Sequence, residues 1–280
     1  MTIEDKRRAA ENILRSFDRV IVAFSGGVDS TLLAKLARDL LGKPNALAVT
    51  ADSPSMARDE LDASRHLAVS LDLEHLVIAT TEVNRQEYQA NTGARCFFCK
   101  QTLFEALEGL AAAQGRCAVL YGAIADDALR ARPGHRAALQ HGVRAPLQEA
   151  GLEKWEIREL AQALGLPNWD KPQNACLSSR IPHGEPVTEG KLRQIELGER
   201  FLREQGFRQI RVRHLGTHAR IEVGTGEVGR FNDAALRVAV EQQFERIGFE
   251  TVGVDRFGYR EGGADHMLVD EVSLSAISRC

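Results

Sequence analysis

Short apolar runs, each the length of one buried strand, alternate with amphipathic segments through the first half of the chain. The predicted strands cover residues 19–24, 46–50, 73–79 and 117–121. The predicted helices cover residues 4–16, 31–41, 56–71, 99–114 and 153–164. Regular alternation of strand and helix predicts an α/β fold with a doubly wound parallel sheet. Ligands of such sheets bind beyond the carboxyl ends of the strands, so the loops that follow the strands are the first places to look for function.

The pattern changes after a loop that carries four prolines between residues 167 and 187. Beyond it we expect a helix, two strands, a second helix and a further strand, over residues 188–205, 208–214, 220–223, 231–247 and 250–254. This order is typical of a small α+β domain, and it is similar to the ferredoxin-like order. We therefore predict two domains, one over residues 1–175 and a smaller C-terminal α+β domain for substrate binding or oligomerisation over residues 185–280.

Composition restricts the class of protein. The 280 residues are 44% hydrophobic and 27% charged, which is typical of a soluble globular protein, and the net charge of −3 argues against a nucleic acid partner. No apolar run approaches the roughly 20 residues that cross a bilayer, so no membrane partner is expected. The first residues lack the apolar stretch of a signal peptide, which favours a cytoplasmic protein. Five cysteines, an odd number, do not indicate a disulfide framework.

The first predicted strand runs into the stretch Ser25-Gly26-Gly27-Val28-Asp29-Ser30, which a helix follows. The glycines allow a ligand to approach the backbone, and the N–H groups at the start of the helix attract an anion, typically a phosphate. The spacing differs from that of a Walker A loop. Asp29 would repel a phosphate unless Mg²⁺ lies between them. The stretch therefore predicts a phosphate site that uses Mg²⁺.

Two further loops follow strands that end at the same edge of the sheet. Thr50 to Ser53 come after the second strand, and Gly122 precedes Asp126 and Asp127 after the fourth. Ser53 could simply cap a helix, and acids favour a first helical turn. Carboxylates at this edge would also be suitable ligands for Mg²⁺, and we favour that role for Asp126 and Asp127.

Three cysteines are candidates for metal binding or for reaction as thiolates. Cys96 and Cys99 form a C-x-x-C pair, which is incomplete for structural zinc and lacks the setting of a thioredoxin-type redox site. Cys176 lies in a polar loop bounded by prolines, where a core-filling role is not expected, and the charge of nearby Arg180 would favour its thiolate form. Cys117 is expected to be an inert thiol in a strand.

These motifs together resemble those of one family. The turn S-G-G-V-D-S is similar to the PP-loop of the ATP pyrophosphatases, whose fold is adenine nucleotide alpha hydrolase-like. With R-C-F-F-C-K, G-A-I-A-D-D, C-L-S-S-R-I-P and R-V-R in the same order, the whole chain resembles the LarE family. The resemblance implies an ATP-dependent sulfur transferase that adenylates the carboxylates of pyridinium-3,5-biscarboxylic acid mononucleotide and converts them to thiocarboxylates. This reaction belongs to the synthesis of the nickel-pincer nucleotide cofactor. A homo-oligomer is also expected.

The resemblance also implies roles for particular residues. ATP and Mg²⁺ would be bound by Ala23, Ser25, Gly26, Gly27, Asp29, Ser30, Thr50, Ser53, Gly122, Asp126 and Asp127. The nucleotide-like substrate carries a phosphate, for which the candidates are Arg132, Arg180, Arg211 and Arg213. The simpler interpretation of Arg211 and Arg213 is a solvated strand face. Glu199 and Glu222 are candidate metal ligands, although Arg230 stands where the family pattern has an acid.

The family has two sources of sulfur, and the residues of this chain suit both. In one branch the cysteine that matches Cys176 gives up its own sulfur. In the other, three cysteines, here Cys96, Cys99 and Cys176, hold a 4Fe–4S cluster that carries an extra sulfide. We favour the cluster, because Cys96 and Cys99 otherwise have no role. Both versions expect Cys176 to lie near the glycine turn, and the cluster version also expects Cys96 and Cys99 beside it.

Three other functions remain open at this point. A transfer-RNA thiolase also joins a PP-loop to three cysteines, but it would expect a basic surface. An amide-forming synthetase of the NAD or GMP synthetase type would leave the three cysteines unexplained. A nucleotide sensor without enzymatic activity would keep the loop and would not need the thiols.

Overall fold

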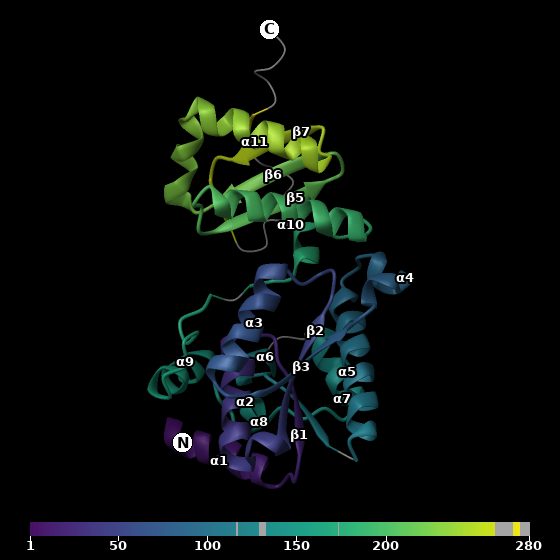
Figure 1. The fold of residues 1–280 in the computed structure, drawn as a ribbon, viewed down its shortest axis with the longest axis vertical. Coiled ribbons are helices and arrows are strands. Elements are labelled where there is room, and N and C mark those ends of the chain that lie inside the picture. The colour runs from purple at the N-terminus through teal and green to yellow at the C-terminus, as the bar shows by residue number, and fades with distance from the viewer. Residues whose placement is uncertain (116, 129–132, 173, 261–270, 275–280) are drawn as a thin grey trace. The chain divides into compact units, whose positions relative to one another are not determined.

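The four strands that the hydrophobic pattern predicts form one parallel sheet in the computed structural model (Figure 1). The structure describes residues 1–115, 117–128, 133–172, 174–260 and 271–274. Two compact units divide the chain: residues 1–88 with 93–174, and residues 89–92 with 175–280. The loop of prolines thus contributes its residues from 175 onward to the second unit.

The sheet of the first unit has the strand order β3-β2-β1-β4. Its strands are β1 (Val20–Ala23), β2 (Ala46–Asp52), β3 (Glu74–Ala79) and β4 (Ala118–Tyr121). The long helices are α1 (Ile3–Arg15), α2 (Val28–Leu41), α3 (Arg58–Ser70), α5 (Arg95–Ala113) and α9 (Lys154–Ala163). Shorter ones are η1 (Lys43–Asn45), η2 (Glu82–Asn84), α4 (Gln86–Gln89), α6 (Ala125–Ala128), α7 (Pro133–Gln140) and α8 (Pro146–Glu149). The α/β prediction is confirmed.

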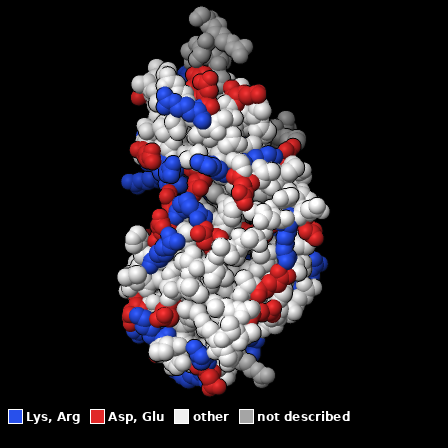
Figure 2. Space-filling model, turned by 45° about the vertical axis from the view of Figure 1, so that its right-hand side comes forward, with Lys and Arg blue, Asp and Glu red and all other residues white. Residues whose placement is uncertain are grey.

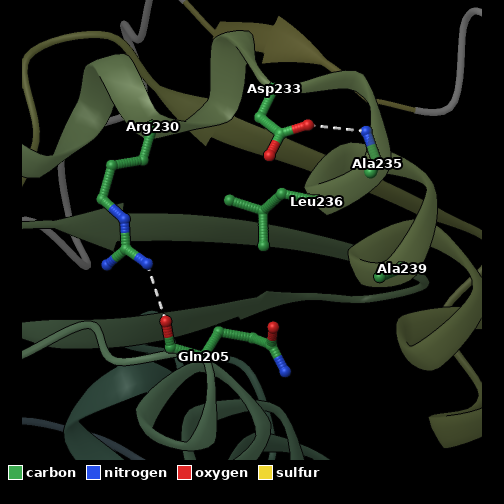
Figure 3. Close-up of a pocket in the computed structure, with 6 residues that line it drawn as sticks. All are labelled: Gln205, Arg230, Asp233, Ala235, Leu236 and Ala239. Atoms are coloured by element: carbon green, nitrogen blue, oxygen red, sulfur yellow. Dashed lines mark hydrogen bonds between the residues drawn. The ribbon is translucent and has the colours of Figure 1, made fainter.

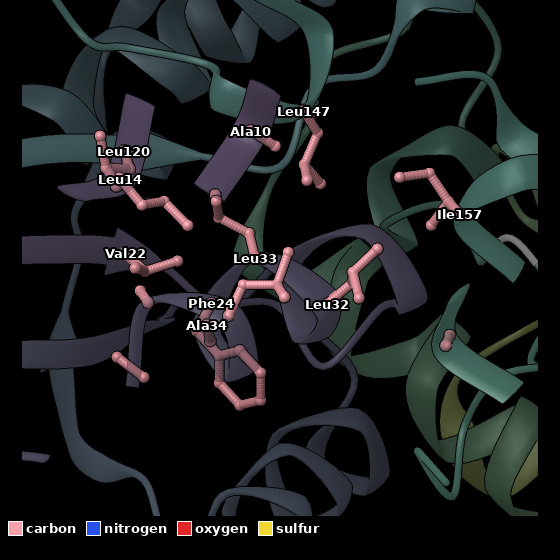
Figure 4. Close-up of a cluster of buried hydrophobic side chains, with 14 of the residues drawn as sticks. Ala10, Leu14, Val22, Phe24, Leu32, Leu33, Ala34, Leu120, Leu147 and Ile157 are labelled. Carbon is pink, nitrogen blue, oxygen red and sulfur yellow. The ribbon is translucent and has the colours of Figure 1, made fainter. Parts of the chain in front are cut away.

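Alternate residues of β1 supply the cores on the two faces of the sheet. Val20 and Val22 pack into one cluster with residues of α1, α2, α8 and α9 (Figure 4). Ile21 and Ala23 pack into another cluster with residues of α5 and α7. Because side chains of a strand point alternately to opposite faces, a strand with a core on both faces must be apolar throughout. This is why the sequence of β1 is a continuous apolar run.

Two details near the cysteines differ from expectation. Helix α5 begins at Arg95 and not near residue 99, so Cys96 and Cys99 lie on its first turns. Phe97, between the two cysteines, is buried in the core beside this sheet, so the first turn of α5 packs against that core. Cys117 precedes β4 and is half-buried, so the prediction that it lies within a strand was wrong.

The second unit contains a mixed sheet in the order β5-β6-β7-β8, with β6 and β7 parallel and the other pairs antiparallel. Its strands are β5 (Ile210–Leu215), β6 (His218–Val223), β7 (Thr251–Asp255) and β8 (Glu271–Ser273). Its helices are η3 (Leu177–Arg180), α10 (Glu189–Glu204), η4 (Thr225–Asn232) and α11 (Ala234–Ile247). Leu192, Ile195 and Phe244 on the helices are buried with Val212 and Ile221 on the strands.

The short segment 89–92 belongs to the second unit, which the sequence did not indicate. The side chain of Asn91 is buried and donates hydrogen bonds to the carbonyl groups of Pro182 and Glu185. The Gly184 N–H donates to the Asn91 carbonyl, and the Val187 N–H to the Gln89 carbonyl. These bonds tie a loop of the first half of the sequence to the second unit.

In the described parts of the chain, no helix combines the length and the apolar character that a membrane span requires.

His214, on β5, makes the stability of the second unit depend on pH. Its side chain is buried beside Phe249, and desolvation and the charge of Lys191 lower its pKa to about 4. An unfolded histidine has a pKa of about 6.5. Stability is therefore fully present above pH 6.5, and it falls by up to about 1.4 kcal/mol per unit as the pH drops from 6.5 toward 4. We expect His214→Gln to flatten this dependence in urea unfolding, whereas the exposed His183→Gln should leave it unchanged.

Candidate active site

The glycine turn joins β1 to α2 as the pattern predicted. Gly26 has a φ of 70°, and a Cβ there would lie 3.1 Å from the Cβ of Ser64, so the turn favours glycine. Gly27 is the N-cap of α2 and supplies no side-chain hydrogen bond to the first N–H groups of the helix. The Ser30 hydroxyl donates to the Gly27 carbonyl and accepts from the Ser25 N–H. The turn therefore presents backbone donors at a helix start, where a phosphate binds favourably.

Acidic side chains gather beside this turn. Asp29 Oδ1 lies 2.6 Å from Lys154 Nζ, and Asp126 Oδ2 accepts a hydrogen bond from the Lys154 N–H at 2.8 Å. Asp127 Oδ2 accepts from the Ile124 N–H. Desolvation is the main cause that raises the pKa of Asp29; the charge of Asp127 adds to it, and Lys154 opposes it. Carboxylate oxygens of this kind suit Mg²⁺, which usually takes one or two of them together with substrate phosphates.

The hydroxyl groups predicted to face the nucleotide are engaged within the protein. Thr50 is buried, and its hydroxyl donates to the Phe24 carbonyl at 2.7 Å. Ser53 is buried and donates to the carboxylate of Glu82, which also accepts from the Ser55 hydroxyl at 3.1 Å. Glu82 lies far from both serines in the sequence, so no local pattern identified it. These bonds hold the loop after β2 in place, and the contact of Thr50 and Ser53 with ATP stays a prediction.

Gly122 lies against the backbone of the glycine turn. A Cβ there would lie 2.7 Å from the Ser30 nitrogen and 3.0 Å from the Asp29 carbonyl carbon, and backbone cannot yield as a side chain can. We expect Gly122→Ala to displace the start of α2, to cost about 1–3 kcal/mol of stability and to weaken ATP binding. The matched control is Gly109→Ala, because Gly109 lies within α5 with nothing near its added Cβ. It should stabilise the protein by about 0.5–1 kcal/mol. Urea unfolding and ATP titration measure both variants, and equal effects of the two would contradict the expectation.

Three polar residues beyond α8 reach the glycine turn, and sequence reasoning missed all of them. Lys154 forms the ion pair with Asp29. The side-chain amide of Asn168 donates to the Gly26 carbonyl at 3.1 Å and to the Thr31 hydroxyl at 3.0 Å. Lys171 Nζ lies 3.4 Å from the same carbonyl and 2.6 Å from Glu60. These residues surround the expected phosphate site with two positive charges.

Cys176 lies in the second unit, exposed at the N-cap of η3. The guanidinium of Arg180 donates to the carbonyl groups of Ala175 and Cys176, at 2.6 and 2.9 Å. Arg180 is itself buried and forms a two-bond ion pair with Glu199, at 2.8 and 3.1 Å. Arg213 donates to the Ser179 carbonyl at 3.1 Å. Two buried guanidinium groups therefore fix the backbone of the cysteine loop and leave the thiol exposed.

The other candidates of the second unit form a network of charges. Glu222 accepts from Arg213 at 2.8 Å and from Arg220 at 3.3 Å, and all three side chains are buried. Arg211 packs over the ring of Tyr259 and has no carboxylate within ion-pair distance among the described residues. Burial, and next the charge of Arg180, lower its pKa. One of its nitrogens, Nη1, donates to the Ile210 carbonyl at 2.6 Å. The binding of the substrate phosphate by Arg211 stays a prediction.

The candidate metal ligands Glu199 and Glu222 are occupied by arginines. Glu199 accepts from Arg180 and from the Val212 N–H. Arg230, in the place of the expected acid, packs 4.0 Å from the ring centre of Phe207 and donates to the Gln205 carbonyl. It lines a pocket of about 530 Å³ with Asp233 and Leu236, to which none of the predicted site residues contributes (Figure 3). These contacts do not fit a metal site at Glu199 and Glu222, whose metal role stays an untested prediction.

The remaining predicted residues belong to the first unit. Cys96 is exposed and Cys99 is partly buried on one side of α5, three residues apart. Within each unit, the described residues include no group of three or more His, Cys, Asp or Glu side chains that could hold a metal ion. Arg132 lies outside the described residues. The 4Fe–4S cluster therefore stays a prediction.

The face of the molecule that Figure 2 draws shows no continuous basic surface. On the face that Figure 2 draws, lysine and arginine are interspersed with aspartate and glutamate, and no extended surface carries one sign. Proteins that bind nucleic acid usually show a continuous basic surface.

The first unit has a parallel sheet, a glycine turn with backbone donors, and acidic side chains beside that turn. These features are those of an ATP-dependent enzyme of the PP-loop class. Comparison agrees with this class, because residues 10–129 match the model of the NAD synthase family. An uncharacterised protein from Synechocystis is 41% identical over 95% of this chain and 99% of its own length. A glutamine-hydrolysing GMP synthase component from Methanococcus maripaludis is 30% identical over 60% of this chain and 55% of its own length.

A further relative identifies the family. The pyridinium-3,5-bisthiocarboxylic acid mononucleotide synthase of Lactiplantibacillus plantarum is 36% identical over 95% of this chain and 96% of its own length. This chain belongs to the LarE family, as its motifs predicted.

Proposed function

We propose that this protein is an ATP-dependent sulfur transferase that converts the carboxylates of pyridinium-3,5-biscarboxylic acid mononucleotide to thiocarboxylates. The observation that carries the proposal is the nearly full-length relation to a synthase of the bisthiocarboxylic product. The exposed Cys176 in a loop fixed by arginines supports it, because the reaction requires an accessible sulfur.

The first step joins the carboxylate to AMP. A carboxylate oxygen attacks the α-phosphorus of ATP, the bond to the β-phosphate breaks, and pyrophosphate leaves with the electron pair. The N–H groups at the start of α2 and the cations Lys154 and Lys171 neutralise phosphate charge. Mg²⁺ shields the phosphates when bound, and the carboxylates of Asp29, Asp126 and Asp127 are of the type that would hold it.

The second step exchanges oxygen for sulfur. The Cys176 thiolate attacks the activated carbonyl carbon, AMP leaves, and a thioester forms. Loss of the α-proton of Cys176 then breaks its Cβ–S bond, which leaves dehydroalanine in the protein and a thiocarboxylate on the product. Arg211 is the candidate to bind the substrate phosphate, with Arg180 and Arg213 placing the cysteine loop. A cluster on Cys96, Cys99 and Cys176 would supply an exogenous sulfide to the same acyl adenylate.

Mass spectrometry and product analysis test the proposal directly. The protein, purified without oxygen and assayed for iron and sulfide, is incubated with ATP, Mg²⁺ and the dicarboxylate mononucleotide. Release of AMP and pyrophosphate that depends on the dicarboxylate supports the adenylation step. Thiocarboxylate formation, with the mass of H₂S lost at Cys176, supports the cysteine as donor; formation without that loss in an iron-loaded protein supports the cluster. Absence of substrate-dependent AMP would contradict the proposal.

The other functions predict different outcomes in the same assay. The GMP synthase component aligns with only 60% of this chain, and an amide-forming activity would need ammonia and would not involve Cys176. A transfer-RNA thiolase would release AMP with transfer RNA in place of the dicarboxylate. A nucleotide sensor would release no pyrophosphate. A cytoplasmic location and a homo-oligomer remain predictions, and light scattering on the purified protein tests the second.

A further inference from the structure

Helix α9 presents two positive side chains toward the glycine turn. Lys154 and Arg158 are four residues apart, so they lie on the same face of the helix. Lys154 Nζ is 2.6 Å from Asp29 Oδ1, within the turn itself. The charge of Arg158 opposes the rise in the pKa of Asp29 that desolvation causes. This face of α9 is therefore directed at the loop that binds phosphate.

Arg158 retains an unused donor at this position. Its Nε is buried and has no hydrogen-bond partner among the described residues. The 3.4 Å contact between its Nη2 and the Lys171 carbonyl is at the long limit for a hydrogen bond. Buried donors are normally satisfied, so this guanidinium is arranged for a partner that arrives with the ligand.

The reaction explains why such cations are needed. Cleavage between the α- and β-phosphates transfers the electron pair of the broken bond to pyrophosphate, so negative charge develops on the leaving group. Backbone donors at the start of α2 favour the phosphate chain, yet Asp29 opposes it with a charge of the same sign. Fixed cations next to Asp29 would stabilise the charge that develops on the leaving group.

We propose that Lys154 and Arg158 form the part of the site that binds the leaving pyrophosphate. Lys154 is held by Asp29 in this structure. Asp29 has the type of carboxylate that would hold Mg²⁺, which would leave Lys154 available to the β- and γ-phosphates. Arg158, fixed one helical turn away, donates its free Nε–H to the same group. The inference rests on ATP cleavage by this loop and not on the identity of the carboxylate.

Direct binding of the two products to the full chain tests the assignment. Calorimetric titration with pyrophosphate and Mg²⁺, and separately with AMP, is carried out for Lys154→Met, Arg158→Met and Arg158→Lys. We expect each methionine variant to weaken pyrophosphate binding about 10–100-fold, because each loses a charge-assisted hydrogen bond, while AMP affinity changes less than about 3-fold. Arg158→Lys should recover part of the pyrophosphate affinity. The control is Lys43→Met, which removes an equal charge from an exposed ion pair with Asp72 and should change neither affinity.

Several results would overturn the assignment. These are unchanged pyrophosphate affinity in both methionine variants, an equal loss for pyrophosphate and AMP, or no pyrophosphate binding by the unsubstituted protein. Thermal melting of each variant identifies misfolding. If Arg158→Met does not fold, the pyrophosphate affinity of Arg158→Lys, which keeps the positive charge and the aliphatic part of the side chain, is used in its place. The proposed function can fail independently of this assignment. If the protein binds pyrophosphate through Lys154 and Arg158 but forms no AMP with the dicarboxylate, the assignment holds and the proposed substrate is wrong.

Discussion

Replacing Cys176 with serine is expected to lower thiocarboxylate formation by about a thousandfold or more, since removal of a nucleophile typically has an effect of this size or larger. The hydroxyl has nearly the same shape as the thiol but supplies no sulfur and binds iron poorly. Adenylation should continue, because the glycine turn is untouched. The expected signature is therefore substrate-dependent pyrophosphate release without thiocarboxylate, measured by phosphate detection and mass spectrometry.

The matched control is Cys117→Ser, which removes a half-buried thiol next to β4. It should leave both steps unchanged. Cys96→Ser and Cys99→Ser separate the two sulfur sources: with a cluster they should abolish sulfur transfer and iron binding, whereas with Cys176 as donor they should preserve the transfer. Thiocarboxylate formation by Cys176→Ser at the unsubstituted rate would exclude both versions of the proposed chemistry.

Arg180→Met is expected to destabilise the second unit by about 3–5 kcal/mol, because it leaves the carboxylate of Glu199 buried without its main partner. Both side chains of this pair are only 2% exposed. The variant also removes the donors to the carbonyl groups of Ala175 and Cys176. Urea unfolding should therefore show the loss of stability, and thiocarboxylate formation should fall even where the protein remains folded.

A second substitution separates stability from positioning. Arg180→Met combined with Glu199→Leu removes both charges, and replacement of a buried ion pair by apolar residues is often close to neutral. We expect the double variant to recover most of the stability but not the sulfur transfer, because the cysteine loop still lacks its donors. The control is Arg65→Met, at an exposed pair with Asp62, which should cost less than about 1 kcal/mol. Full recovery of transfer by the double variant would show that Arg180 acts on stability alone.

Local patterns were sufficient for the parts of the fold that depend on neighbouring residues. Strand β1 is a short, continuous apolar run because the sheet carries a core on both of its faces at this strand. The turn between Ser25 and Ser30 is recognisable because glycine conformation and a helix start are both local properties. Strand β8 was missed, because only three residues form it and its pairing with β7 is a contact between distant segments.

The amino-acid sequence alone determined the class of the fold, the phosphate turn and the presence of a cysteine in a polar loop. The tertiary structure decided which charges meet: Lys154 with Asp29, Glu82 with Ser53, and Arg180 with Glu199. In each pair the partners are separated by between 19 and 125 residues. An ion pair or hydrogen bond requires an approach to about 3 Å, which periodicity does not predict for segments so far apart. The pairing of Glu199 with Arg180 could therefore not be predicted from the sequence, and the role of Glu199 as a metal ligand stays a prediction.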